Sequence, residues 1–292
     1  MIIKTNAYAK LNLTLDITGV LPDGYHSVDM IMQSISLCDI VTLTTNDCGA
    51  IVSTSDDEKL NSFGLNIASK AATMFFATAG ISDGVEIYIE KKIPLAAGLG
   101  GGSADAAAVL CALNNAYSNP LSEQDLQKIG LTLGADVPFC MIGGTMQALG
   151  KGEKLTRLQI IPDCWIVIAK PCEKTSTGQL YSAVDNIKVL RHPNTEAAIK
   201  AIECEDLTAL CDNIYNVFEM VWDESKMDNV RLAMLQRGAI ATGISGSGPT
   251  IFGIFDGRIV AQKCCDFIKS NQVWAKIASP VNSGNQILEI AD

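Results

Sequence analysis

The sequence lacks the surplus of basic residues that marks most nucleic-acid-binding proteins. Its 292 residues include 22 Lys and Arg against 32 Asp and Glu, which gives a net charge of −10. Proteins that grip a DNA or RNA backbone depend on clustered cations, so we expect no nucleic-acid partner. An anionic ligand would have to be held locally, by backbone N–H groups and a few cations.

The cysteines lack the spacing of a metal or redox site. None of the ten stands in a C-x-x-C pair, which disfavours zinc and thioredoxin-like sites. Several lie in apolar runs, such as Cys111 in AAAVLCAL. We therefore expect buried free thiols in a protein of a reducing compartment.

Long apolar stretches are missing as well. The opening MIIKTNAYAK is followed by a mixed segment and not by the apolar run of a secretory signal. No window reaches the roughly 18 apolar residues that a membrane-spanning helix needs. With 48% apolar and 18% charged residues, the chain can still bury a large core. We expect a cytoplasmic protein with no membrane partner.

Strand and helix patterns alternate along the whole chain. Apolar and polar residues alternate in KLNLTLDI, which predicts a strand over 2–17, and VEIYIEKKI predicts another over 85–93. SISLCDIVTLTT, residues 34–45, predicts a pair of strands. The alanine-rich stretch 104–117 predicts a helix. Both halves of the chain thus mix helices and strands.

Three further segments predict two helices and a loop. Residues 121–134 form a helix pattern, with Ser122 as the N-cap and Gly134 at its end. The segment GADVPFCMIGG, which starts at Gly134, predicts a loop, and residues 213–236 predict one helix.

A glycine-rich segment lies between a predicted strand and a predicted helix. Glycines let backbone N–H groups approach a ligand closely, and a helix N-terminus adds about half a positive charge. Together they form a phosphate cradle, although a tight turn without a ligand remains the alternative. The Lys of a Walker A loop is absent, and Ser103 stands where a dinucleotide fingerprint needs glycine. The residues predicted to bind the nucleotide are Pro94, Ala96, Ala97, Gly98, Leu99, Gly100, Gly101, Gly102 and Ser103.

Three segments together resemble the motifs of the GHMP kinase superfamily: AYAKLNLTLDI at 7–17, PLAAGLGGGSADAAAVL at 94–110 and GISGSGPTIFGIF at 243–255. Their order and separation match the superfamily across nearly the whole chain. The resemblance implies an α+β, GHMP kinase two-domain fold. A ribosomal protein S5 domain 2-like N-terminal domain would span 1–158, and a ferredoxin-like C-terminal domain would span 159–292. ATP and Mg²⁺ would bind in the cleft between them, with Asn66 near the adenine.

Within the superfamily, Lys10-Leu11-Asn12, DGYH at 23–26 and GADVPF at 134–139 resemble kinases whose small-molecule substrate carries a cytidine diphosphate. An isolated loop aspartate is more often a turn residue, but the resemblance makes Asp136 catalytic, with Lys10 beside it. Asp136 would accept the proton of the attacking hydroxyl or orient that hydroxyl.

The resemblance also implies the acceptor site. Tyr25 and His26 would bind the cytosine, with Tyr181 as a second stacking face. Asn12 faces the same side of its strand as Lys10 and could hydrogen-bond the substrate. Gly243 and Ser247, in the third motif, would also contact the substrate.

Some alternatives remain open at the level of sequence. Ser103 is either a helix N-cap or a hydroxyl associated with the metal, and no other protein ligand of Mg²⁺ is predicted. Another GHMP kinase, acting on mevalonate, homoserine or a sugar, is the main alternative function. A non-catalytic ATP-binding sensor of the same fold is a second. We expect a monomer or a weak homodimer.

Overall fold

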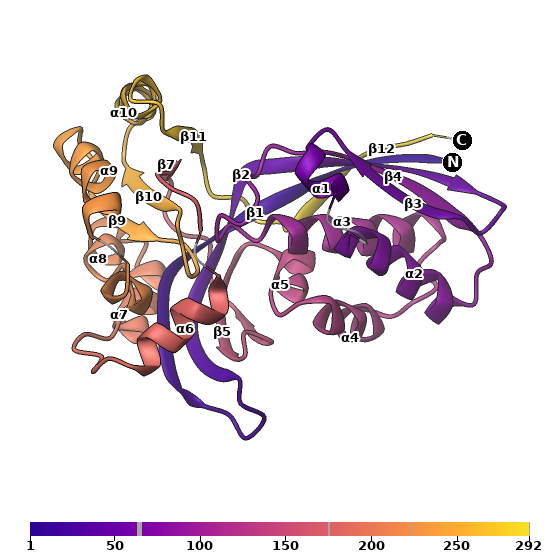
Figure 1. Ribbon diagram of the computed structural model, residues 1–292, viewed down its shortest axis with the longest axis horizontal. Helices are drawn as coiled ribbons and strands as arrows, with labels where there is room; N and C mark the ends of the chain where they lie inside the picture. Colours follow the sequence, from indigo (N-terminus) through magenta and orange to yellow (C-terminus); the bar gives the residue numbers. More distant parts are fainter. Residues whose placement is uncertain (63–65, 175, 223, 292) are drawn as a thin grey trace.

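The computed structural model describes residues 1–62, 66–174, 176–222 and 224–291. It has two lobes, and the long strands β1 and β2 run through both of them (Figure 1). The strands of the larger sheet are β1 (Ile2–Val20), β2 (His26–Asn46), β3 (Ile51–Ser55), β4 (Gly84–Glu90), β5 (Thr145–Gly150), β6 (Lys154–Arg157), β8 (Tyr215–Asn216) and β12 (Asn285–Ala291).

The larger sheet is built on the antiparallel pair β1 and β2. Their register runs from Ile2 opposite Thr44 to Val20 opposite His26. The sheet continues in the order β12-β1-β2-β4-β3, and β5 pairs with a different part of β2. The predicted pair of strands over 34–45 is therefore wrong, because this segment is part of one long strand that stays paired with β1, with a shift of register between Tyr8 and Ala9.

The last strand of the chain returns to the first. β12 pairs antiparallel with β1, so that the two termini lie close together at one end of the molecule (Figure 1). This strand follows the second lobe in sequence but belongs to the larger sheet. The predicted boundary after residue 158 stays a prediction.

Four helices share a core with the larger sheet. They are α2 (Ile67–Ala79), α3 (Gly101–Ala116), α4 (Glu123–Leu133) and α5 (Val137–Ile142); the short α1 (Glu58–Ser62) follows β3. All but α4 contact strands of the sheet, and α4 packs against the other three. The core contains Phe75 of α2 and Phe139 of α5, both fully buried. Helix α3 is buried along most of its length because alanines let it approach its neighbours closely.

The second lobe contains a smaller antiparallel sheet in the order β11-β7-β10-β9. Numbered along the chain this is 4-1-3-2, the arrangement of the ferredoxin-like fold, so the expected fold of this lobe is confirmed. Its strands are β7 (Trp165–Lys170), β9 (Ala241–Ile244), β10 (Ile251–Phe255) and β11 (Trp274–Ala278). The helices that follow β7 are α6 (Thr177–Asp185), α7 (Thr195–Glu203), α8 (Leu207–Asp212), α9 (Glu224–Gln236) and α10 (Arg258–Ser270), of which α9 and α10 contact this sheet.

The predicted caps of helix α4 are confirmed, whereas the predictions for the segment after Gly134 and for residues 213–236 are wrong. Ser122 Oγ accepts a hydrogen bond from the Asp125 amide, and Gly134 is the C-cap. The predicted loop after Gly134 is wrong because it contains α5, with a proline in its first turn and a buried face. The predicted helix over 213–236 is wrong in its first half, which forms β8 and a 3₁₀ helix (Val217–Met220).

The cysteines agree only in part with the expectation of buried free thiols. All ten cysteines are free, as expected, but Cys48 and Cys204 are exposed. Throughout the described residues, each helix is too short or too polar to cross a bilayer.

Candidate active site

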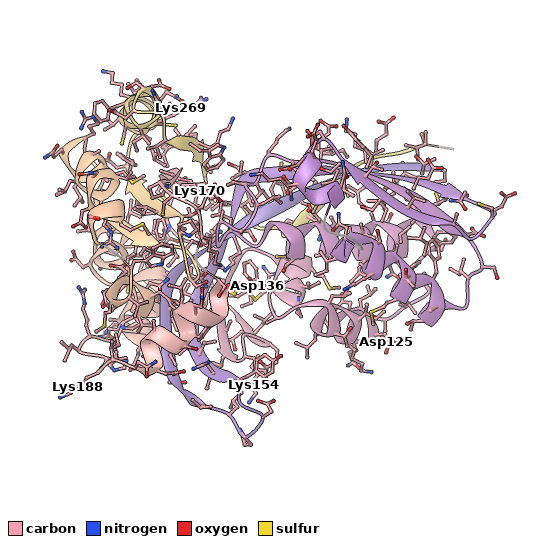
Figure 2. The ribbon with its side chains drawn as sticks, in the orientation of Figure 1. Asp125, Asp136, Lys154, Lys170, Lys188 and Lys269 are labelled. Atoms are coloured by element: carbon pink, nitrogen blue, oxygen red, sulfur yellow. The ribbon has the colours of Figure 1, made fainter. Side chains whose placement is uncertain are left out.

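A cavity of about 420 Å³ lies between the two lobes. Asp136 lies where the lobes meet, whereas the labelled lysines 154, 170, 188 and 269 are spread over other parts of the molecule (Figure 2). The lining comes from β1, the glycine-rich segment, the start of α5, the segment before α6 and the loop after β9. Elements far apart in the sequence therefore supply one site.

The glycine-rich segment bends sharply before it enters α3. Ala96, Gly98 and Gly100 have φ angles of 51°, 80° and 70°. A Cβ at Gly98 would collide with the carbonyl oxygen of Ser245, so this position requires glycine both for its φ angle and for space. Gly100 is the N-cap of α3, and the helix begins at Gly101.

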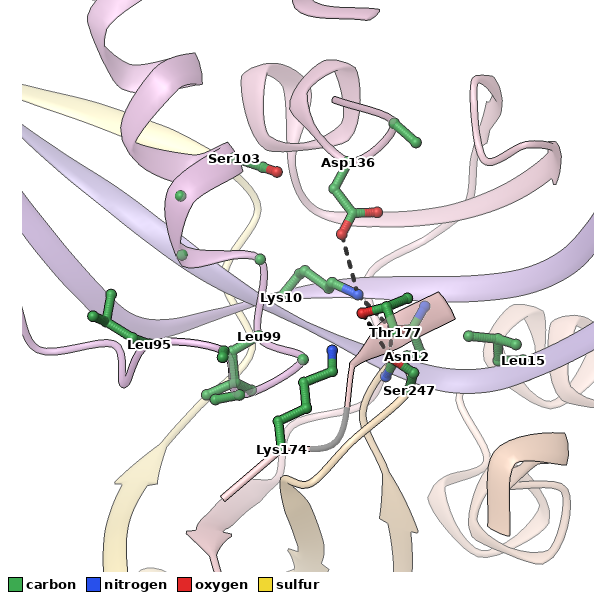
Figure 3. Close-up of a pocket in the computed structure, with 18 of the residues that line it drawn as sticks. Lys10, Asn12, Leu15, Leu95, Leu99, Ser103, Asp136, Lys174, Thr177 and Ser247 are labelled. Carbon is green, nitrogen blue, oxygen red and sulfur yellow. Dashed lines mark hydrogen bonds and ion pairs between the residues drawn. The ribbon is translucent and has the colours of Figure 1, made fainter. Parts of the chain in front are cut away.

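Ser103 does not cap α3, because the helix has already begun two residues earlier. That alternative is wrong, while the second one, a hydroxyl at the metal and phosphate site, stays a prediction. The Ser103 side chain does line the cavity at the N-terminal end of α3 (Figure 3). The other glycine-segment residues predicted to bind nucleotide, 94 and 96–102, line it too.

Lys10 and Asp136 form the charged centre of the cavity. Lys10 Nζ lies 3.4 Å from Asp136 Oδ2 and donates a 2.7 Å hydrogen bond to Asn12 Oδ1 (Figure 3). Lys10 is 4% exposed, while the Asp136 side chain is 30% exposed and faces the cavity. The carboxylate is thus open to a ligand, and the lysine behind it is fixed.

Asn12 is buried on the same strand face as Lys10. Its Oδ1 accepts hydrogen bonds from Lys10 Nζ and, at 2.8 Å, from the Gly246 amide. Its Nδ2 contacts Met30 Sδ at 3.1 Å. Asn12 is therefore not an exposed strand residue, and its side chain connects the first motif to the third.

The third motif closes the cavity from the second lobe. Ser245 Oγ donates to the carbonyl of Gly98 at 2.9 Å, and Ser247 lines the cavity. Gly243 does not line it. A Cβ there would press on Phe252 and Ile214, so Gly243 serves packing in β9, and its predicted substrate contact is not supported by this position.

A second cavity of about 870 Å³ adjoins the first. The two cavities share lining residues, among them Lys151, Thr177 and Tyr181. Tyr25 and His26 line only the second one. The structure therefore brings the three predicted base-binding residues, Tyr25, His26 and Tyr181, to one place beside the charged centre.

The aromatic rings of this second cavity are held by their neighbours. The His26 and Tyr181 ring centroids lie 4.6 Å apart, and His26 Nε2 lies 2.9 Å from Asp185 Oδ1. Burial raises the pKa of Tyr181 to about 12, which keeps its phenol neutral. Tyr25 is 64% exposed, with the Lys151 ammonium 4.2 Å from its ring centroid.

Asn66 has a structural role that the sequence did not indicate. It is the N-cap of α2, where its Oδ1 accepts a 3.1 Å hydrogen bond from the Ala68 amide. Asn66 does not line the first cavity, the one of about 420 Å³ at the glycine-rich segment (the glycine-loop cavity), although its neighbour Ile67 does. Its predicted position near the adenine stays a prediction.

Several cavity residues were not predicted from the sequence, among them the polar residues Lys91, Lys151, Lys174 and Thr177. Lys174 precedes α6 and reaches the cavity from the second lobe. Burial, helped by the positive charge of Lys10 and opposed by Asp136, lowers the pKa of Lys174 to about 8. The segment KTSTGQLY at 174–181 resembles the same kinase family as the motifs above, but the sequence did not single out Lys174 as a cation of the cavity.

The site also fits Mg²⁺ brought by a nucleotide. Within the described residues, no group of three or more His, Cys, Asp or Glu side chains could hold a metal by itself. Mg²⁺ usually keeps several waters and takes one or two protein oxygens in addition to substrate phosphates. The Ser103 hydroxyl, at the start of α3 in the same cavity, is a donor of this kind.

The fold and the cavity are those of a small-molecule kinase of the GHMP type. Residues 66–144 match the family described as GHMP kinases N terminal domain, and residues 224–272 match GHMP kinases C terminal. A solved homoserine kinase from Cytophaga hutchinsonii shares the fold, with a TM-score of 0.75 at 22% identity over 98% of this chain and 97% of that one.

Curated relatives narrow this class. The 4-diphosphocytidyl-2-C-methyl-D-erythritol kinase of Clostridium tetani is 43% identical over 93% of this chain and 98% of the relative. The kinase of the same name from Caldicellulosiruptor saccharolyticus is 42% identical over 92% and 93%. A crystal structure of 4-(cytidine 5'-diphospho)-2C-methyl-D-erythritol kinase has a TM-score of 0.79 at 29% identity, over 95% of this chain and 98% of that one. This chain therefore belongs to the GHMP kinases, in the 4-diphosphocytidyl-2-C-methyl-D-erythritol kinase family, and the resemblance seen in its motifs is confirmed.

Proposed function

We propose that this protein transfers the γ-phosphoryl group of ATP to the 2-hydroxyl of 4-diphosphocytidyl-2-C-methyl-D-erythritol, in non-mevalonate isoprenoid precursor biosynthesis. One observation carries the proposal: the Lys10–Asp136 pair faces the glycine-rich segment in one cavity, and Tyr25, His26 and Tyr181 line a second cavity adjoining it. A phosphate donor and a nucleotide-linked acceptor each have a place, and the catalytic pair lies between them.

The donor site rests on backbone groups. The first turn of α3 has unpaired amides and the positive end of the helix dipole, which together favour the phosphates of ATP. Mg²⁺ would be held by those phosphates and the Ser103 hydroxyl, and it supplies neutralising charge when bound. A protein of net charge −10 can bind ATP in this way without a basic surface.

Asp136 and Lys10 act on the acceptor hydroxyl. Asp136 accepts a hydrogen bond from the hydroxyl and takes its proton as the new bond between oxygen and the γ-phosphorus forms. The bond to the β–γ bridging oxygen breaks, and ADP leaves with that electron pair. The transition state is usually loose, so most of the aspartate's work is orientation. Lys10, 3.4 Å away, pairs with the carboxylate and holds it in place.

The second cavity supports recognition of the cytosine. Tyr25 and Tyr181 offer two aromatic faces, and base–aromatic stacking contributes about 1–3 kcal/mol per base. His26 packs against Tyr181 and offers a ring nitrogen to the base edge. Mevalonate, homoserine and galactose have no base to fill this cavity.

A coupled assay of ADP release tests the proposal. The protein would be given ATP and Mg²⁺ with 4-diphosphocytidyl-2-C-methyl-D-erythritol, mevalonate, homoserine or galactose as acceptor. We expect turnover with the cytidyl substrate only. Turnover with another acceptor instead would leave a kinase and refute the assignment of the second cavity, whereas ATP binding without turnover of any acceptor would favour a sensor.

A further inference from the structure

Four lysines line the glycine-loop cavity: Lys10, Lys91, Lys151 and Lys174. The first three have carboxylate partners. Lys10 pairs with Asp136, Lys91 with Asp39 and Asp105, and Lys151 with Asp23. Within the part of the chain that the structure describes, Lys174 makes no ion pair or hydrogen bond.

Lys174 approaches the cavity from the lobe opposite the glycine-rich segment. Its backbone lies between β7 and α6, and its side chain reaches inward on the side where Asn12, Thr177 and Ser247 lie (Figure 3). It is partly buried. Lys10 and Asp136 line the same cavity, so the Lys174 ammonium lies near the transfer centre (Figure 3).

A partly buried ammonium without a counter-ion is unfavourable until an anion enters the cavity. The reaction brings phosphate there. Lys10 is already engaged by Asp136 and Asn12, so it has little capacity left for phosphoryl oxygens. A second cation, on the side of the cavity opposite the glycine-rich segment, would stabilise the negative charge of the transferred phosphoryl group.

The lining of the two cavities indicates whether Lys174 would bind the phosphates of ATP or the diphosphate of the acceptor. Lys151 lines both cavities and contacts the Tyr25 ring, so it lies toward the cytidine end. Lys174 lines the glycine-loop cavity and not the second one. Its ammonium therefore belongs with the phosphates of ATP and not with the diphosphate of the acceptor.

We propose that Lys174 is a further catalytic residue, whose ammonium binds the γ-phosphoryl oxygens of ATP from the second lobe and stabilises their charge during transfer. The inference rests on the proposed phosphoryl transfer. Lys174 keeps its proton throughout, while the acceptor proton passes to Asp136 and ADP leaves as described above.

Nucleotide binding tests this role without any acceptor. Isothermal titration calorimetry would compare the Mg²⁺ complexes of ADP and the non-hydrolysable analogue AMP-PNP, on the wild type, Lys174→Met and Lys174→Arg. Lys188→Met, an exposed lysine of the same lobe, is the matched control. Loss of a charge-assisted contact of about 1.5–3 kcal/mol corresponds to a roughly 10- to 150-fold weaker AMP-PNP affinity in Lys174→Met. ADP affinity should stay within about twofold, and Arg should restore most of the difference.

Kinetics then separate catalysis from binding. With the cytidyl acceptor, Lys174→Met should lower kcat by about 10²- to 10³-fold, as for loss of one transition-state donor, with the acceptor KM nearly unchanged. The wild-type kcat/KM should fall as pH rises above about 8, because the ammonium loses its proton; Lys10, Asp136, Lys151 and Tyr181 are the other titratable groups around it. This fall should vanish in Lys174→Met and move to higher pH in Lys174→Arg.

Two results would overturn the inference. A raised acceptor KM with an unchanged AMP-PNP to ADP affinity ratio would assign Lys174 to the acceptor diphosphate. Wild-type values throughout would give it no role at all. If the wild type phosphorylates none of the acceptors, the proposed function fails, but the nucleotide titrations still decide the contact to the γ-phosphate.

Discussion

At the scale of single residues, the site combines fixed charges with exposed aromatic side chains. Lys10 is buried and bonded on two sides, so it cannot move far from Asp136. Tyr25, by contrast, is mostly exposed, and its ring lies against the Lys151 ammonium. The catalytic pair is thus formed before ligands arrive, whereas the stacking surface gains its contacts from the ligand.

Replacing Tyr25 by Ala should weaken acceptor binding and leave the fold intact. Loss of one stacking face, about 1–3 kcal/mol, predicts an acceptor KM raised by about 5- to 150-fold, with the KM for ATP unchanged. An exposed side chain contributes little to folding, so the free energy of unfolding should change by about 0.5 kcal/mol or less. Tyr88→Ala, an exposed tyrosine outside both cavities, is the control, and an unchanged acceptor KM in Tyr25→Ala would refute the stacking role.

Sequence reasoning reached the residues that lie in motifs and missed those that do not. Lys10, Asp136, Tyr25 and His26 lie in segments with a family resemblance, and the structure brings them to adjoining cavities. Lys174 is recruited by tertiary structure alone, because its position depends on how the second lobe sits over β1. No local pattern carries that information.

At the scale of elements, a buried ion network anchors the start of α3. Lys91, just after β4, pairs with Asp39 of β2 and with Asp105 of α3, where Nζ and Oδ2 are 2.8 Å apart. Asp39 Oδ1 also accepts hydrogen bonds from the amides of Lys92 and Ile93, at 2.6 and 2.8 Å. The network ties the phosphate-binding end of α3 to the sheet.

The network should make stability depend on pH. Burial raises the pKa of Asp105 to about 7 from its ordinary 3.8, although Lys91 opposes the shift. The folded state therefore binds more protons than the unfolded state between those pH values, and the contribution of Asp105 to stability falls as pH rises from about 4 to 7. Above that range it is constant.

Lys91→Met should destabilise the protein by about 3–5 kcal/mol at pH 8, because it leaves two buried carboxylates without a counter-ion. The loss should be smaller at pH 6, where a carboxyl can protonate. Urea unfolding at the two pH values measures this. Adding Asp105→Asn to Lys91→Met should recover part of the loss, since one carboxylate is removed. Equal losses at both pH values, with no recovery, would contradict the network's role.

Helices, caps and bends were predicted correctly where they depend on residues close together in the sequence. The cap of α4 and the glycine bend before α3 depend on neighbouring residues, and both were predicted. Helix α5 has six residues, too few to show a helical period, and packing of Val137 and Phe139 stabilises it. The single long β2 and the return of β12 to β1 depend on partners far away in the sequence.

At the scale of the whole molecule, the third motif joins the two lobes. Ser245 Oγ bonds the Gly98 carbonyl, and the Gly246 amide bonds Asn12 Oδ1. From β8, which pairs with β1 in the larger sheet, Asn216 Nδ2 donates to the carbonyls of Ile244 and Gly246, each at 2.8 Å. The donor loop, the catalytic strand and the second lobe are therefore held in one arrangement, on which the short distances of the site depend.

Phosphorylation of 4-diphosphocytidyl-2-C-methyl-D-erythritol by the wild type and by Asp136→Asn tests the central claim most directly. Product formation would be followed by ³¹P NMR, with AMP-PNP titrations and urea unfolding to show that the variant folds and binds nucleotide. We expect a phosphomonoester on the acceptor with the wild type, and a kcat lower by about 10²- to 10⁴-fold in the variant with nucleotide affinity retained. A wild type that forms no phosphomonoester, or a variant that forms it at the wild-type rate, would contradict the account.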